Sequence, residues 1–143
     1  MVEEILQKSV SISKDMGHEY VTIEHVTLVL VDQTQIQDIF TALGIDTDQL
    51  KADINNYLDD YEFNNLKHDS GNTGDPKKTV AVERVFQRAF AQSIFNGREQ
   101  ISAIDLLVSI TNESQSHATY FLTLNGLDKQ QLIEHLTVHG DGS

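Results

Sequence analysis

The chain has 143 residues, 39% of them hydrophobic, which suits one globular body with a single core, or two very small ones. Its 22 acidic residues outnumber 10 basic ones, and the resulting net charge of −12 disfavours nucleic acids and anionic membranes as partners. The absence of cysteine excludes disulfides, thiol catalysis and thiolate metal sites. Neither a secretory leader nor an apolar run of about 20 residues is present, so we expect a cytoplasmic protein without a membrane segment.

Four helices are expected between residues 3 and 60. Apolar residues at helical spacing begin at Ile5, and a second apolar stripe follows Thr22, which is a suitable N-cap. A third stripe ends at Gly44, a common residue after a helix C-terminus. Asp46 then provides the N-cap of a fourth helix. Because the only proline of the chain lies outside these stripes, the sequence predicts an all-α protein.

The second half of the chain repeats the first. Val85 follows Ile5 at an offset of 80 residues, in the same apolar spacing, and Gly126 follows Gly44 at an offset of 82. The N-caps recur as well, because Ser102 forms a capping box with Asp105. We therefore predict a pseudo-two-fold tandem repeat of two four-helix units, about eight helices in all, packed as one body.

The repeats set the expected organisation of the chain. Residues 1–140 form a single domain, in which repeat one covers 3–60 and repeat two covers 80–139. The stretch between them, 64–79, is rich in Gly, Asn, Asp and Pro, which predicts a mobile surface loop. Residues 141–143 are expected to begin a linker.

A search for catalytic motifs finds none that is complete. His18 and Glu19 begin a HExxH zinc motif, but Thr22 stands where the second histidine is required. His135 and His139 have the i, i+4 spacing of metal ligands on one helix face, yet no third ligand accompanies them, and a solvated helix face is favoured. No phosphate-binding loop, dinucleotide turn or nucleophile elbow occurs either. We expect a non-catalytic chain without a metal or a cofactor.

Two groups of charged side chains are expected to have interaction partners outside their own helix. Arg84 and Arg88 place like charges at i, i+4, and Arg84 lies early in a helix, where the dipole disfavours cations. Its acidic partner could be internal or belong to another molecule. Glu24 is well placed to complement a helix N-terminus, whereas Glu19 lies before the cap and gains less.

Four segments carry a resemblance to a known family. They are His18–His25, the following residues 26–30, the helix at 85–89, and Asn112–Leu122. Together they resemble the N-terminal repeat domain of Clp-type AAA+ unfoldases, with ClpA as the most similar type. The similarity extends from about residue 3 to His139, and only the loop at 63–78 departs from it.

The resemblance implies a docking domain of an ATP-dependent unfoldase. In this family the domain binds a ClpS-type adaptor that delivers protein substrates, and the ClpP peptidase is reached only through the ATPase rings of the full-length parent. Carried over by position, the adaptor-binding residues are Glu19, Glu24, Thr79 and Arg84. A free-standing regulator that sequesters the adaptor is the alternative, since no Walker motif occurs in the chain.

The basic residues are unevenly distributed. Five of the ten fall in one short stretch: Lys77, Lys78, Arg84, Arg88 and Arg98. We therefore expect an acidic body with a local basic region at the start of the second repeat.

Overall fold

The computed structural model describes residues 2–60, 76–97 and 100–139. The first repeat contains the helices α1 (Val2–Asp15), α2 (Ile23–Leu30), α3 (Thr34–Leu43) and α4 (Thr47–Leu58). The second contains α6 (Val80–Phe95), α7 (Ala103–Thr111), α8 (His117–Leu124) and α9 (Lys129–His139). The prediction of an all-α, duplicated fold is confirmed.

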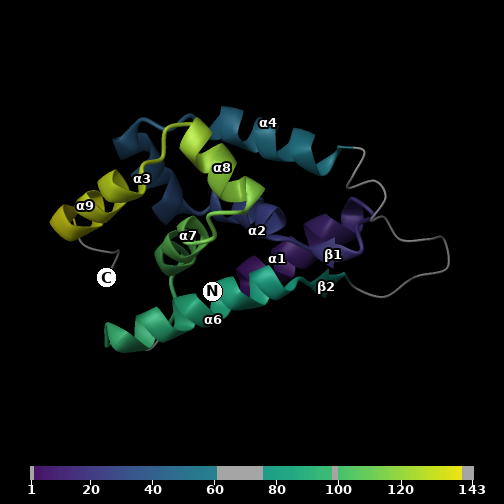
Figure 1. The fold of residues 1–143 in the computed structure, drawn as a ribbon, viewed down its shortest axis with the longest axis horizontal. Coiled ribbons are helices and arrows are strands. Elements are labelled where there is room, and N and C mark those ends of the chain that lie inside the picture. Colours follow the sequence, from purple (N-terminus) through teal and green to yellow (C-terminus); the bar gives the residue numbers. More distant parts are fainter. Residues whose placement is uncertain (1, 61–75, 98–99, 140–143) are drawn as a thin grey trace.

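The helices form a layered arrangement (Figure 1). The short helices α2 and α7 lie inside, with α1 and α6 on one side of them and α4 and α8 on the other. α1 packs on α2, and α6 packs in the same way on α7, while α2 also contacts α4, α7 and α8. The core is therefore shared between the repeats, and its largest fully buried side chains include Phe40, Leu50, Leu106, Ile110 and Leu122.

Equivalent hydrogen bonds recur in the two repeats. The Ser13 hydroxyl donates to the Tyr20 carbonyl at 2.7 Å, and the Ser93 hydroxyl donates to the Gln100 carbonyl at 2.9 Å. Both serines are buried, and both bonds join a long helix to the segment that precedes the next helix. The duplication thus extends to polar contacts inside the molecule.

The helix ends follow the caps expected from the sequence. Gly44 ends α3 with a φ of +75°, and Gly126 follows α8 with a φ of +108°. The Asp46 side chain accepts a hydrogen bond from the Gln49 N–H, and Ser102 and Asp105 form a reciprocal capping box. These predicted caps are confirmed.

One feature was not expected from the sequence, a pair of parallel two-residue strands. β1 (Tyr20–Val21) pairs with β2 (Lys77–Lys78), so that Tyr20 lies opposite Lys77. Lys77 and Lys78 fall within the segment predicted as a loop, and Pro76 just before them is buried. Most of the predicted loop, residues 64–75, lies outside the described part of the chain, as do the predicted linker residues.

Candidate functional site

Glu19 directly precedes β1 and Thr79 directly follows β2, so the parallel pairing places them at opposite ends of the same small sheet. The Lys77 N–H donates to the Glu19 carbonyl at 3.0 Å, and the Thr79 N–H donates to the Val21 carbonyl at 3.1 Å. The Thr79 hydroxyl also accepts the Val82 N–H at 3.1 Å, which confirms Thr79 as the N-cap of α6. Both residues are half-buried. Glu19 and Thr79 therefore flank the small sheet, and Thr79 leads directly into α6.

Arg84 has its acidic partner inside the molecule. Its Nε donates to Glu113 Oε2 at 3.0 Å, and its Nη2 donates to Glu113 Oε1 at 2.5 Å. The guanidinium therefore binds the carboxylate in a bidentate manner. Arg88 Nη2 donates to Oε2 of the same carboxylate at 2.5 Å, and its Nη1 donates to the Ser109 carbonyl at 2.8 Å. One buried carboxylate thus compensates the two like charges that the sequence placed at i, i+4.

The three charges differ in exposure. The Glu113 side chain is 8% exposed, whereas Arg88 is 30% and Arg84 is 52% exposed. The hydrogen bonds from Arg84 lower the pKa of Glu113 to about 2, with Arg88 adding to the effect and burial opposing it. Arg84 is therefore fixed by its ion pair with the buried Glu113, and about half of its side chain remains exposed to solvent.

Glu24 is buried, with 6% of its surface exposed. Its carboxylate accepts the Ala118 N–H at 2.9 Å, and Ala118 lies in the first turn of α8. Burial raises the pKa of Glu24, and the Ala118 hydrogen bond partly offsets that rise. The sequence suggested that Glu24 complements a helix N-terminus, and the helix it serves belongs to the other repeat.

These contacts converge on the connection between α7 and α8. Glu113 in this connection is held by the arginines of α6, and Ala118 at the start of α8 is held by Glu24 of α2. The structure thus places Glu19 and Thr79 at the two ends of the β1–β2 pairing, with Arg84 five residues after Thr79 in α6, and it buries Glu24.

A buried histidine pair was missed by the sequence analysis. His18 Nδ1 and His25 Nε2 are 2.9 Å apart, and His25 Nδ1 accepts the Thr22 backbone N–H at 3.0 Å. His25 is the third residue of α2 and completes a capping box with Thr22. Histidine is not the usual capping-box partner, so this role could not be recognised from the residue pattern.

The possible metal ligands are dispersed over the described residues. In that part of the chain, no group of three or more His, Asp or Glu side chains is placed to hold a metal ion. His135 lies on α9, and the side chain of His139 is outside the described part. Among the same residues, no helix is long and apolar enough to cross a membrane.

The comparison with known families decides the assignment. The sequence matches the Clp repeat (R) N-terminal domain over residues 1–125. The chain belongs to this family. Over 139 residues it is 27% identical to a ClpA homolog protein of Fuscovulum blasticum, and the alignment covers 97% of this chain and 17% of that protein. The chain therefore spans about a sixth of the length of this relative.

Solved structures of Clp N-terminal domains have the same fold. The Hsp104 N-terminal domain of Candida albicans superposes with a TM-score of 0.80 at 7% identity, covering 98% of this chain and 89% of that one. A ClpV N-domain solved in complex with a VipB peptide superposes with a TM-score of 0.70 at 16% identity, covering 97% and 84%. The Clp repeat N-terminal domain is a non-catalytic binding domain, so contacts with other proteins are the relevant chemistry.

Proposed function

We propose that this Clp repeat domain is the adaptor and substrate docking domain of a ClpA-like unfoldase. It binds a ClpS-type adaptor and thereby recruits protein substrates for unfolding and degradation by a ClpP-type peptidase. The relationship to a ClpA homolog and the peptide bound to a ClpV N-domain support this proposal. In this role the domain acts by tethered capture, which raises the local concentration of substrate near the unfolding pore.

The observation that carries the proposal is the surface formed by Glu19, Thr79 and Arg84. Glu19 and Thr79 flank the β1–β2 pairing, and α6 carries Arg84 beyond its N-cap, Thr79. Arg84 is bound by Glu113 yet 52% exposed, so it is preorganised to meet a carboxylate of the adaptor. Glu24, the fourth predicted residue, is buried and supports this surface through α8.

The first prediction concerns Arg84. In isothermal titration with a ClpS-type adaptor, we expect Arg84→Ala to weaken binding roughly 30-fold, because truncating one partner of a desolvated charge pair costs about 2 kcal/mol. Glu113 keeps its Arg88 partner in this variant, so the fold is preserved.

Arg88→Ala is the matched control for Arg84→Ala. It removes a second arginine from the same carboxylate but lies outside the proposed surface. We expect its adaptor affinity to stay within about threefold of the unchanged chain, since surface truncations away from hot spots have small effects. No binding to the adaptor, or equal losses in the two variants, would contradict the proposal.

A further inference from the structure

Aromatic side chains of α4 and α8 meet on the side of the molecule opposite to α1 and α6 (Figure 1). Tyr57 of α4 stacks on His117 of α8, with ring centroids 4.2 Å apart and ring planes inclined by 22°. Phe121 lies edge-on to Tyr57 at 5.8 Å and to Tyr120 at 5.3 Å. Together with Leu124, which follows on α8, we refer to these four residues as the α4–α8 surface.

The α4–α8 surface is open to solvent although most of its side chains are apolar. Tyr120 is 59% exposed and Leu124 is 60% exposed, and His117 is exposed as well. These three residues are spaced i, i+3, i+7 and therefore line one side of α8 along its length. The core uses the other side of that helix, where Ala118 and Leu122 are buried. Large apolar side chains that gather outside the core are typical of an interaction surface.

Carboxylates lie at both ends of the α4–α8 surface. Asp53 precedes Tyr57 by four residues and accepts hydrogen bonds from Gln49 Nε2 at 2.8 Å and from Asn125 Nδ2 at 2.9 Å. Because both donors are neutral amides, they orient the carboxylate and leave its charge in place. At the other end, Asp60 is exposed, and its N–H donates to the Tyr57 carbonyl at 3.1 Å. An apolar stripe is therefore bordered by two negative charges.

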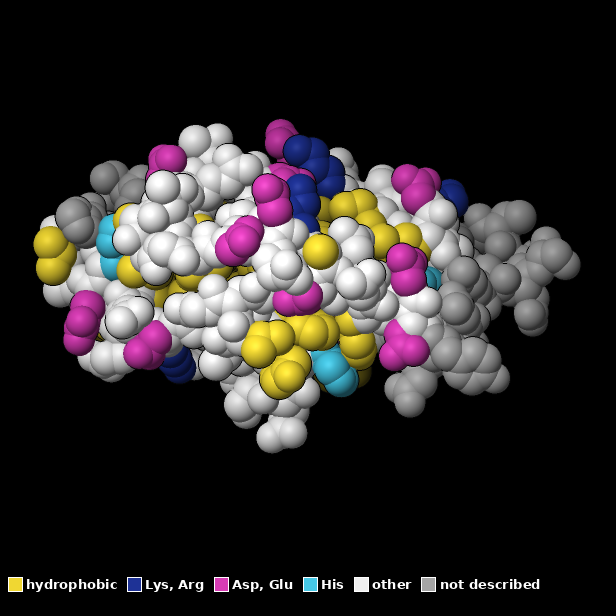
Figure 2. Space-filling model, turned by 90° about the horizontal axis from the view of Figure 1, so that it is seen from above, with side chains coloured by type: hydrophobic (Ala, Val, Ile, Leu, Met, Phe, Trp, Pro, Cys, Tyr) yellow, Lys and Arg dark blue, Asp and Glu magenta, His cyan; other side chains and the backbone are white. Residues whose placement is uncertain are grey.

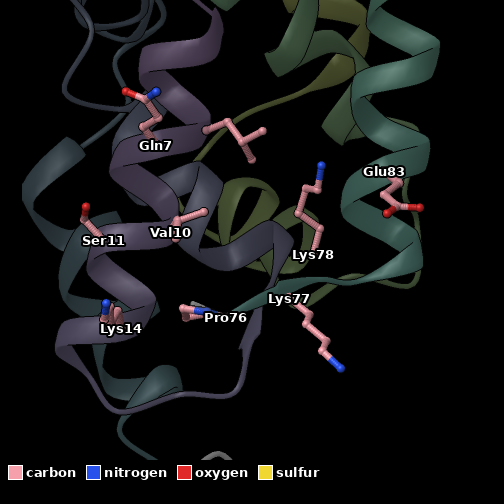
Figure 3. A pocket seen from close by; sticks show the side chains of 9 residues that line it. Gln7, Val10, Ser11, Lys14, Pro76, Lys77, Lys78 and Glu83 are labelled. Atoms are coloured by element: carbon pink, nitrogen blue, oxygen red, sulfur yellow. The ribbon is translucent and has the colours of Figure 1, made fainter. Parts of the chain in front are cut away.

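The basic side chains nearby do not neutralise this end of the molecule. α8 contains no Asp, Glu, Lys or Arg, and the one basic residue of α4, Lys51, is bound to Asp32 at 2.9 Å. Three other lysines, Lys14, Lys77 and Lys78, line a pocket between α1 and the segment that joins β2 to α6 (Figure 3). Asp and Glu side chains, by contrast, are spread over the face that carries α4 and α8 (Figure 2). The α4–α8 surface therefore attracts cations.

We propose that the α4–α8 surface binds a helix of a partner protein whose apolar stripe is bordered by arginine at both ends. From His117 to Leu124 the stripe on α8 rises about 10 Å, which matches about two turns of a partner helix. The apolar side chains of that helix pack between the ridges of α4 and α8, and its arginines pair with Asp53 and Asp60. Arginine suits this surface better than lysine, because a guanidinium also stacks on aromatic rings such as that of Tyr120.

Charge argues against a second copy of this chain as the occupant. A symmetric contact would place the same patch of both copies face to face, so Asp53 and Asp60 of one copy would approach those of the other. Like charges brought together in this way oppose association. The proposal is also independent of adaptor binding, since none of these residues belongs to the surface formed by Glu19, Thr79 and Arg84.

A fluorescein-labelled peptide of sequence Arg-Ala-Leu-Ala-Ala-Leu-Leu-Ala-Ala-Leu-Arg tests this proposal by fluorescence anisotropy. We expect saturable one-to-one binding to the full chain, weakened about tenfold when both Arg residues of the peptide are replaced by Glu. Tyr120→Ala should weaken binding of the original peptide about fivefold, because it removes an exposed ring from the centre of the surface. Phe95→Ala is the matched control. It truncates an aromatic side chain that is 89% exposed on α6, so the affinity should change less than about twofold.

Asp53→Asn tests the contribution of charge. It keeps an acceptor oxygen for the Gln49 or Asn125 amide and removes the negative charge, so we expect binding of the arginine peptide to weaken about threefold. A peptide with Gln in place of both Arg residues should bind this variant and the unchanged chain equally. Glu83→Gln, the same kind of change at an exposed residue of α6, is the matched control and should leave the affinity for the arginine peptide unaltered.

Circular dichroism establishes that each variant is folded. Absence of binding, equal binding of the Arg and Glu peptides, or equal losses for Tyr120→Ala and Phe95→Ala would overturn the proposal. Analytical ultracentrifugation adds a further test, because a dimer of the unchanged chain that Tyr120→Ala dissociates would assign the surface to a second copy and would overturn the proposal as well.

Discussion

At the scale of single residues, the hydrogen bonds of the His18–His25 pair determine which ring nitrogen of His25 carries the proton. The Thr22 N–H donates to His25 Nδ1, so the proton of neutral His25 is on Nε2, from which it is donated to His18 Nδ1 at 2.9 Å. Adding a proton to His25 would place N–H donors against each other in a buried site. Burial, with a smaller contribution from His18, accordingly lowers the pKa of His25 to about 3.

This pair predicts a pH dependence of stability. Above pH 6.5 His25 is neutral in both the folded and the unfolded chain and contributes no pH dependence. Below pH 6.5 the unfolded chain binds a proton that the folded chain excludes, so the free energy of unfolding falls by about 1.4 kcal/mol per pH unit from this residue. Glu113 affects stability at lower pH than His25. Because its pKa in the folded chain is about 2, its ion pairs stabilise the fold above pH 4.5 and are lost as pH falls towards 2.

Replacing His25 isolates its contribution. Between pH 6.5 and 4.5, urea unfolding of His25→Gln should show a smaller decline in the free energy of unfolding than the unchanged chain. His117→Gln is the comparison variant, since it makes the same change at a histidine that is exposed at the start of α8. Identical slopes for His25→Gln and the unchanged chain would show that the buried pair does not govern acid stability.

At the scale of elements, the sequence predicts the features that depend on residues close together in the chain. Helix periods, the caps at Thr22, Asp46 and Ser102, and the stop at Gly44 are short-range features, and the structure has each of them. The strands β1 and β2 have two residues each, which is too short to carry a period, and their pairing joins distant parts of the chain.

The candidate site shows the same limit of prediction. Thr79 could be recognised as a cap, but the partner of Arg84 is 29 residues away in sequence and that of Glu24 is 94 residues away. Both partners lie near the connection between α7 and α8, whose position depends on how the repeats pack together. Spacing along one helix could therefore identify the unusual charges without identifying what they bind.

The end of α3 offers a test of a local feature. Gly44 has a φ of +75°, and the Ile45 N–H beyond it returns to the Phe40 carbonyl at 2.9 Å. A Cβ at Gly44 would meet no atom within 4 Å, so the cost of Gly44→Ala is backbone strain alone. We expect the free energy of unfolding to drop by about 1 kcal/mol.

Gly44→Asn is the matched variant for this measurement. Asparagine tolerates the left-handed conformation better than alanine, so its loss in urea unfolding should be smaller. If alanine proved as stable as glycine at this position, the helix would have to end without the left-handed residue.

At the scale of the whole molecule, the two repeats pack against each other. α2 of the first repeat contacts α7 and α8 of the second, and α4 contacts α8. The Glu24 carboxylate crosses the same boundary to Ala118, and Asn125 Nδ2 donates to Asp53 Oδ2 at 2.9 Å. Each repeat therefore completes the core and the helix ends of the other.

Separating the repeats should unfold both of them. A chain of residues 1–60 exposes the faces of α2 and α4 that contact α7 and α8, and a unit of about 60 residues has little core to spare. We expect weak helical circular dichroism and no cooperative urea transition for residues 1–60 or 61–143 alone. Mixing the two at equal concentration should restore the helical signal, because the surfaces removed by the cut are complementary. Cooperative unfolding of either half by itself would show that the repeats are independent domains, and the support that Glu24 gives to the docking surface through α8 would then be dispensable.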